Sequence, residues 1–288
     1  MIISHLLNGI HVGSIYALVA LGYSMVYGII KLINFAHGDI IMVGAYVAWF
    51  TISSLKLPVW LSLVLTVICC TVLGVTIEKV AYKPLRSSPR ISLLITAIGI
   101  SLLLENLAQL IFSSAAKPFP TLISGFFTIG NQKVEYTTLV TIVISVVLMI
   151  VLSFLVNKTR MGRAMRAVSE DTEAAQLMGV NVNNTISFTF AIGSALAAVA
   201  AILYCCSYPQ VKPTMGSMLG LKAFVAAVLG GIGSIPGAVV GGFAIGIAEA
   251  LVKSVNSQVS DAIVFGILIV TLLIKPAGLL GKNVSEKV

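Results

Sequence analysis

The sequence predicts an all-α membrane protein, a polytopic bundle of about eight transmembrane helices that forms one domain over residues 1–288. Hydrophobic residues make up 58% of the chain and charged residues only 10%, whereas a soluble protein carries about a quarter charged residues. Long apolar runs follow one another along the chain. None of the polar stretches between them is long enough for a separate globular domain.

The first six apolar runs are each long enough for the roughly 20 helical residues that cross a bilayer. They lie near 6–30, 34–54, 59–81, 91–113, 138–157 and 183–206. The first run has no basic segment before it and no small-residue cleavage site after it, so we expect an uncleaved span rather than a signal peptide. Small residues at spacings of four, such as Gly9 and Gly13 or Gly242 and Gly246, permit close helix packing, either within the chain or with a partner.

The next two runs, 216–229 and 238–252, are shorter, and a turn rich in glycine with one proline separates them. They form either a broken, re-entrant helical pair, whose irregular backbone must be buried in protein, or two ordinary spans. Lys222 and Glu249 lie near the same predicted end of these runs, and we expect them to pair with each other. The last run lies near 259–275.

Basic residues are concentrated on one side of the predicted bundle. Because cytoplasmic loops carry an excess of lysine and arginine, this side is predicted to face the cytoplasm, with the N-terminus outside and the C-terminus inside. Twelve of the eighteen basic residues lie there: Lys31, Lys79, Lys83, Arg86, Arg90, Lys158, Arg160, Arg163, Arg166, Lys275, Lys282 and Lys287. Membrane topology therefore explains the net charge of +8, and no nucleic-acid partner is expected.

The longest polar interruption, residues 158–184, contains a predicted short helix. Asp171 can cap this helix because its carboxylate can accept the free N–H groups of the first turn, and Glu173 suits the positive end of the helix dipole. Gly179 suits the left-handed conformation that often ends a helix. The small side chains of Ala174 and Ala175 let another backbone approach closely. This pattern predicts a docking element of about two turns, roughly 10 Å long, outside the membrane.

The motif Glu173-Ala174-Ala175, then three intervening residues and Gly179, resembles the loop by which ABC importer permeases engage their ATPase. The wider stretch 166–181 and the stretch 13–46, GSIYALVALGYSMVYGIIKLINFAHGDIIMVGAY, resemble the branched-chain amino acid permeases of the LivH type. The spacing of the apolar runs between them also fits, so the resemblance covers nearly the whole chain.

This resemblance implies the permease subunit of an ATP-driven importer for leucine, isoleucine and valine in the bacterial cytoplasmic (inner) membrane, with residues 158–184 as its cytoplasmic coupling loop. It implies four kinds of partner: two separate ABC ATPase subunits that bind ATP and Mg²⁺, a second related permease chain, an external substrate-binding protein and the lipid bilayer. Members of the family also transport urea, amides or other amino acids. The solute therefore stays open, as does the choice between a homodimer and a heterodimer.

Polar residues inside the predicted spans are candidates for a transport pathway or gate. Asn34, His37, Gly38 and Asp39 lie where the second span begins. They either cap that span or line a cavity, and in the second case Gly38 would allow a break in the helix. Glu105 lies well inside the run 91–113, where a charge normally faces the bundle interior, a partner or water. It is either a satisfied structural carboxylate, the simpler interpretation, or part of the pathway.

No catalytic or metal-binding set of residues is evident, so the chain is not expected to be an enzyme. The cysteine pairs 69–70 and 205–206 lie in apolar runs without histidine or carboxylate at ligand spacing, and we expect small buried hydrophobic residues there. Gly281-Lys282 lacks the serine or threonine of a phosphate-binding loop, so ATP is not expected to bind here and no cofactor is expected in this chain. The alternative function is a secondary transporter or channel for a small solute that acts without an ATPase.

Overall fold

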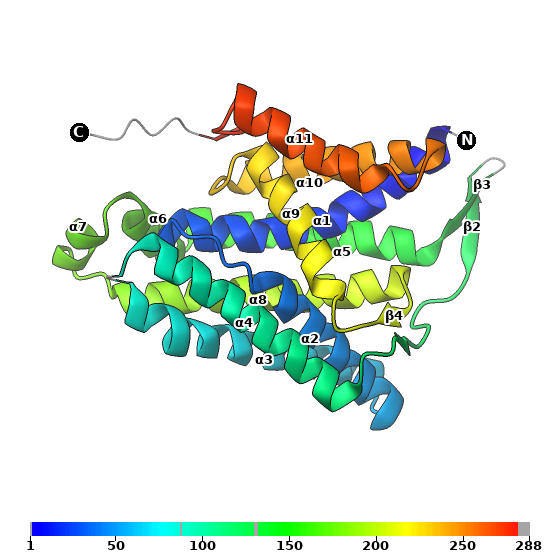
Figure 1. Cartoon of the computed structure of the whole chain (residues 1–288), viewed down its shortest axis with the longest axis horizontal. Coiled ribbons are helices and arrows are strands. Elements are labelled where there is room, and N and C mark those ends of the chain that lie inside the picture. Colours follow the sequence, from blue (N-terminus) through cyan, green and yellow to red (C-terminus); the bar gives the residue numbers. More distant parts are fainter. Residues whose placement is uncertain (1, 87, 130–131, 282–288) are drawn as a thin grey trace.

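The computed structural model describes residues 2–86, 88–129 and 132–281 and shows helices whose axes run mostly along the longest dimension of the molecule (Figure 1). Within these residues, six helical stretches are long and apolar enough to cross a membrane. They contain α1 (Ile2–Ile30), α3 (Val59–Ile77), α4 (Arg90–Phe112), α5 (Tyr136–Lys158), α8 (Val182–Ser207) and α10 (Ile235–Val255), and the shorter apolar helices are α2 (His37–Trp49), α9 (Met215–Gly230) and α11 (Ser260–Ile274). The predicted transmembrane helical bundle is confirmed.

The remaining elements lie at the two ends of the bundle (Figure 1). One end carries α6 (Arg160–Glu170) and α7 (Thr172–Leu177). The other end carries an antiparallel hairpin, β2 (Phe126–Ile129) with β3 (Gln132–Glu135), and the pair of β1 (Lys117–Pro118) with β4 (Gln210–Val211). α1 begins at the hairpin end and α11 runs toward the α6–α7 end. Which end faces the cytoplasm stays a prediction, and Lys282 and Lys287, two of the residues on which it depends, lie outside the described residues.

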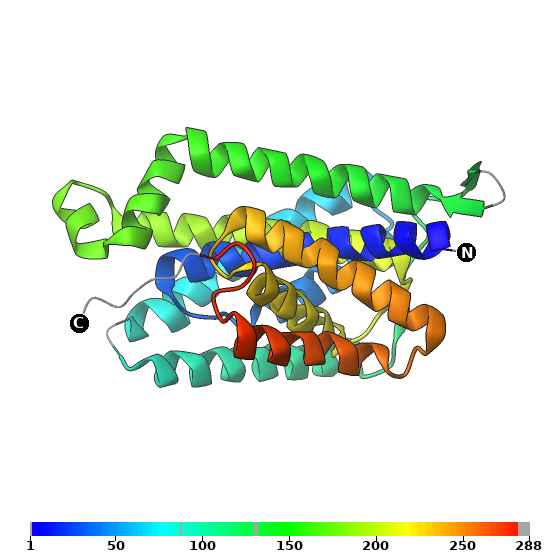
Figure 2. The same ribbon diagram turned by 90° about the horizontal axis from the view of Figure 1, so that it is seen from above.

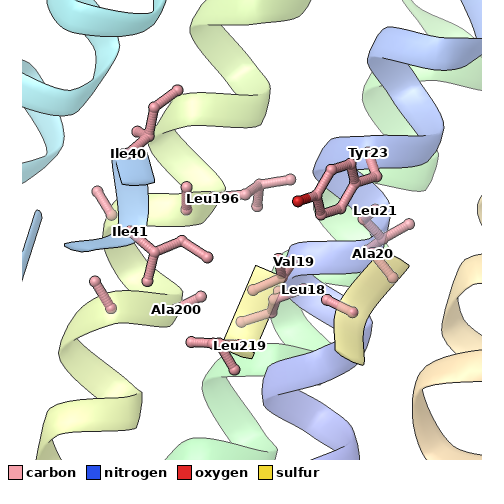
Figure 3. Packing of buried hydrophobic residues seen from close by; sticks show 14 of the residues in the cluster. Leu18, Val19, Ala20, Leu21, Tyr23, Ile40, Ile41, Leu196, Ala200 and Leu219 are labelled. Atoms are coloured by element: carbon pink, nitrogen blue, oxygen red, sulfur yellow. The ribbon is translucent and has the colours of Figure 1, made fainter. Parts of the chain in front are cut away.

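The centre of the bundle is apolar and closely packed. Figure 2 shows α5 along one side and α4 along the opposite side, with α1 and α8 between them. Side chains of α1, α2, α8 and α9 meet in the core, as Figure 3 shows for Leu18, Ile41, Ala200 and Leu219. The outer helices expose large apolar side chains, as expected of surfaces that face lipid; on α4 these include Leu102, Leu103, Leu107 and Leu110.

α1 and α10 pack through their small residues. A Cβ atom at Gly13 would lie 2.9 Å from the Cα atom of Phe243, and one at Gly9 would lie 2.8 Å from the Cα atom of Ile247. Gly246 lies in turn against the backbone of Gly13. Because apolar burial gives helices in lipid little reason to associate, such close backbone packing contributes to holding them together. Of the two alternatives for these small residues, the structure shows packing within the chain.

The second span is shorter than its apolar run predicts. Residues 31–36 are irregular, Lys31 has a φ of 57°, and the helix begins only at His37. From Phe50 to Ser54 it continues as a π-helical turn, η1. His37, Gly38 and Asp39 are all buried in the first turn of α2, so irregular backbone leads into a helix that starts inside the protein. Gly38 does not break this helix.

α9 and α10 are continuous helices that run in opposite directions and are joined by residues 231–234. Gly231 and Gly233 have φ values of 109° and 89°, which few residues other than glycine adopt. The backbone N–H groups of Leu279 and Leu280 donate to the carbonyls of Leu229 and Gly230, each at 2.8 Å, so the end of the described chain covers this turn. With 21 residues α10 is an ordinary span, whereas the 16 residues of α9 reach only about 24 Å.

Candidate functional site

The predicted short helix in the 158–184 loop is present. Asp171, with a φ of −152°, separates α6 from α7, and its Oδ1 accepts hydrogen bonds from the backbone N–H groups of Glu173 and Ala174, both at 2.9 Å. Gly179 adopts a φ of 83° just after α7 and has open space where a Cβ atom would stand. The local geometry therefore matches the capping and termination that the sequence predicts.

The two alanines of this helix do not share one environment. Ala174 is exposed, whereas Ala175 is only 4% exposed and packs against its own chain. Ala175 is thus not on the outer surface, because a six-residue helix that packs against the bundle must bury one face. Leu177 and Met178 are instead 88% and 84% exposed. They form the tip of the segment, which the sequence pattern did not single out.

Contacts with the bundle hold this segment in place. Thr159 caps α6 by accepting a hydrogen bond from the N–H of Gly162 at 3.0 Å. The side chain of Arg166 donates to the carbonyl of Val156 near the end of α5. Met165 and Val168 are buried on the inner face of α6. The exposed tip is therefore presented from a packed base.

A second group of polar residues lies among α2, α4 and α9, and it brings together two of the predicted candidates. The hydroxyl of Ser101 donates to the carboxylate of Asp39 at 2.5 Å, and the hydroxyl of Ser217 donates to Glu105. Ser101 and Glu105 are one helical turn apart on the same face of α4. We refer to these four residues as the carboxylate cluster.

The two carboxyl groups of the carboxylate cluster have no basic partner among the described residues. Asp39 is only 1% exposed and Glu105 is half-buried. Among the described residues, every ion pair within 4.0 Å involves other groups: Arg86 with Glu78, Lys222 with Glu249 and Asp261, and Lys253 with Glu249. Because charge inside a membrane is normally compensated, this cluster is a candidate functional site.

Glycines let α2 and α9 approach closely enough to build the carboxylate cluster. A Cβ atom at Gly220 would lie 3.0 Å from the Cα atom of Gly38, and one at Gly38 would collide with the carbonyl of Gly216. Gly38 therefore serves close packing, and this contact sets Asp39 beside α4.

The other two candidates lie elsewhere. The ring of His37 packs edge-on against Tyr23, with 4.9 Å between ring centroids, and its Nε2 faces Gly22 on α1. The side-chain oxygen of Asn34 accepts a hydrogen bond from the hydroxyl of Tyr82 at 2.8 Å. His37 and Asn34 are thus buried structural neighbours of the cluster and not members of it.

Glu78 is a functional candidate that the sequence did not reveal. It lies in η2 (Glu78–Tyr82), a π-helical turn that extends α3 and leads into the 3₁₀ turn η3 (Lys83–Leu85). Its side chain is fully buried, pairs with Arg86 and accepts the hydroxyl of Ser187 at 2.6 Å. Since Lys79 and Lys83 follow it in the sequence, Glu78 resembled a residue at the polar end of the predicted span 59–81. The signal that could have found it is the regular spacing of 78, 82 and 86.

The predicted pairing of Lys222 with Glu249 is confirmed, within a larger charged network. The ammonium group of Lys222 lies 2.7 Å from Glu249 and 2.7 Å from Asp261. Glu249 also pairs with Lys253 at 2.5 Å and accepts the hydroxyl of Tyr16 at 2.6 Å. This network joins α1, α9, α10 and α11. Two positive and two negative charges balance, which supports an architectural role.

Comparison with known proteins gives consistent matches over the whole chain. A family model described as branched-chain amino acid transport system / permease component matches residues 5–273. The chain is 44% identical to the high-affinity branched-chain amino acid transport system permease protein BraD of Pseudomonas aeruginosa, with 99% of this chain and 98% of that protein aligned. It is 42% identical to the corresponding protein LivH of Escherichia coli K12, with 99% of this chain and 97% of that protein aligned.

Proposed function

The chain belongs to the permease components of branched-chain amino acid transport systems, and we propose that it forms the membrane part of an ATP-driven importer together with separate ATPase subunits. It is a multi-pass membrane protein and a transport subunit rather than an enzyme. The proposed solutes are leucine, isoleucine and valine. A second permease chain and an external binding protein complete the proposed assembly.

The observation that supports ATPase docking at α7 is the exposed tip of this segment. Leu177 and Met178 expose almost their whole side chains at an end of the molecule rich in lysine and arginine. Burying one such side chain is worth about 1.5–3 kcal/mol, so a groove that received both would gain several kcal/mol. A short helix inserted into a groove is a common mode of recognition. Asp171, Glu173, Ala174 and Gly179 would shape and orient this helix, and Ala175 would anchor it to the bundle.

The carboxylate cluster supports a pathway for an amino acid. Asp39 and Glu105 lack a basic partner among the described residues, and an amino acid carries a positive ammonium group. Ser101 and Ser217 hold the two carboxylates through their hydroxyls. A solute with a cationic ammonium group would suit these acidic groups. Gly38 would keep α2 close to α9, while Asn34 and His37 would support the start of α2.

The proposed mechanism is alternating access. ATP-driven closure of the ATPase pair moves α6 and α7, and the attached spans rock about the carboxylate cluster. The hairpin end would face outward and receive the solute from the binding protein. This orientation agrees with the distribution of basic residues.

The test is co-purification of the assembled complex in mild detergent. Leu177→Asp with Met178→Asp should lower retention of the ATPase about a hundredfold, because roughly 3 kcal/mol of apolar burial is lost. Val255→Asp is the matched control, since Val255 is 89% exposed at the end of α10. It should leave ATPase retention unchanged. Full retention by the double variant would contradict the docking proposal.

The alternative, a transporter that works alone, is tested in the same preparation. The chain reconstituted alone in vesicles should show no uptake driven by an ion gradient. Uptake under those conditions would favour a secondary transporter over the ATP-driven importer.

A further inference from the structure

The first part of α8 carries four side chains along a single face. Asn183, Ser187, Phe190 and Ser194 follow one another at intervals of four, three and four residues, which is the spacing of one helical face. This face begins in the first turn of α8, immediately after the α7 segment.

A matching row of four residues lies opposite, at intervals of four along α3, η2 and the residue after η3. Its members are Gly74, Glu78, Tyr82 and Arg86. Gly74 lies directly against Ser194, where any Cβ atom would collide with that serine. Glu78 accepts the hydroxyl of Ser187 at 2.6 Å, and the rings of Tyr82 and Phe190 have centroids 5.5 Å apart.

Arg86 closes the row, because it donates to the side-chain oxygen of Asn183 at 2.7 Å while it pairs with Glu78. We call these two rows of residues the α3–α8 seam.

The charged part of the α3–α8 seam resists sliding. Glu78 is fully buried, and the side chain of Arg86 is only 20% exposed. Separating a buried carboxylate from its partner would leave an uncompensated charge, which is strongly unfavourable. The two rows are therefore expected to stay in register and to move as one body when α8 moves.

The α3–α8 seam has two contacts with the proposed functional segments, one at its Asn183 end and one at Tyr82 within the row. At the Asn183 end, the N–H of Val180 donates to the carbonyl of Ala175 at 3.0 Å, and Asn181 caps α8 by accepting the N–H of Asn184 at 3.0 Å. α7 is therefore joined to α8 by a short turn that is held by hydrogen bonds. Within the row, the hydroxyl of Tyr82 donates to the side-chain oxygen of Asn34 at 2.8 Å. Asn34 lies in the irregular stretch that leads into α2 and Asp39.

We infer that the α3–α8 seam transmits movement of the α7 segment to α2, with the hydrogen bond from Tyr82 to Asn34 as the positioning contact between them. This inference rests on the proposed function, because it assigns a route between the ATPase docking segment and the carboxylate cluster. Tyr82 and Asn34 act through the position of α2 and do not touch the solute.

The test compares two tyrosines in the complete transporter, reconstituted with its ATPase, second permease and binding protein. Tyr82 and Tyr46 are each 2% exposed, but in the part of the chain that the structure describes the hydroxyl of Tyr46 has no hydrogen-bond partner. Tyr82→Phe removes the contact to Asn34, and Tyr46→Phe removes only a hydroxyl. The measured quantity is leucine imported per ATP hydrolysed, which a loss of folded complex alone would not change.

Tyr82→Phe should lower this ratio about fivefold while ATP hydrolysis continues, the factor expected from one hydrogen bond of about 1 kcal/mol. Tyr46→Phe should keep the wild-type ratio. Asn34→Ala breaks the same bond from the other side and supplies the test if Tyr82→Phe yields little complex, and the double variant should be no worse than either single change. An unchanged ratio in Tyr82→Phe, or an equal fall of import and hydrolysis, would overturn the inference. Absence of ATP-coupled import in the wild type would instead refute the proposed function.

Discussion

Lys222→Met is expected to destabilise the protein more than Glu249→Gln does, although the two residues form one ion pair. Lys222 contacts Glu249, which is 1% exposed, and Asp261, whose side chain is 44% exposed. Removing one partner of a buried pair costs about 3–5 kcal/mol, because the other charge stays buried. Glu249 would keep Lys253 and Tyr16, so about 2–3 kcal/mol is expected for Lys222→Met.

Glu249→Gln removes a negative charge but leaves every remaining group a partner. Tyr16 can still donate to the amide oxygen, Lys222 keeps Asp261, and Lys253 is 39% exposed and reaches water. About 1–2 kcal/mol is expected for this change. The double variant has no buried unpaired charge, so its loss should be smaller than the sum of the single losses by about 1.5–3 kcal/mol.

Two native cysteines provide the assay. Cys70 and Cys205 are fully buried and free, so their reaction with a thiol dye reports unfolding. Cys69 and Cys206 are replaced by serine to remove the background. Unfolding is followed in mixtures of mild detergent and dodecyl sulfate. Additive losses, or a larger loss for Glu249→Gln than for Lys222→Met, would refute the argument from the exposure of the remaining partners.

Three further predictions concern other parts of the chain. Glu105→Gln and Asp39→Asn should each lower leucine uptake by the complete transporter about tenfold at unchanged expression, because a charged hydrogen bond to the ammonium group is lost; normal uptake by both would leave the carboxylate cluster a structural role only. Gly246→Val should reduce the amount of folded protein because its side chain enters the backbone of Gly13, whereas Gly266→Val, with open space at its Cβ position, should be tolerated. A cysteine at Thr128 should react with an impermeant thiol reagent outside intact cells and one at Thr172 should not; the opposite result would reverse the predicted orientation.

Helix positions were largely predictable because the bilayer sets the length of an apolar run. The runs 91–113 and 183–206 became Arg90–Phe112 and Val182–Ser207. The cap at Asp171 and the left-handed Gly179 were also predictable, since both depend on neighbouring residues alone. The late start of α2 was not, because burial among other helices rather than local composition stabilises the irregular stretch before it.

The arrangement of the candidate site was harder to predict than its members. α1 is apolar on all sides, so it has no polar face that would indicate which neighbour each residue meets. The sequence identified Asp39 and Glu105 separately, and only the packing of α2 and α9 against α4 brings them to the same place. Glu78 and the outward direction of Leu177 depend on the packing of the chain, which spacing along one helix does not reveal.

The glycine contact between α1 and α10, formed by Gly9, Gly13 and Gly246, also constrains the synthesis of the protein. Tyr16 on α1 and Glu249 on α10 form a hydrogen bond and are 233 residues apart in the chain. At a synthesis rate of about 5–20 residues per second, α1 is in the membrane roughly 10–50 s before α10 leaves the ribosome. During that interval the small-residue face of the first helix has no native partner and contacts lipid, the insertion machinery or other helices. A chain truncated before residue 235 would expose this face permanently, which would make it a recognisable substrate for membrane proteases.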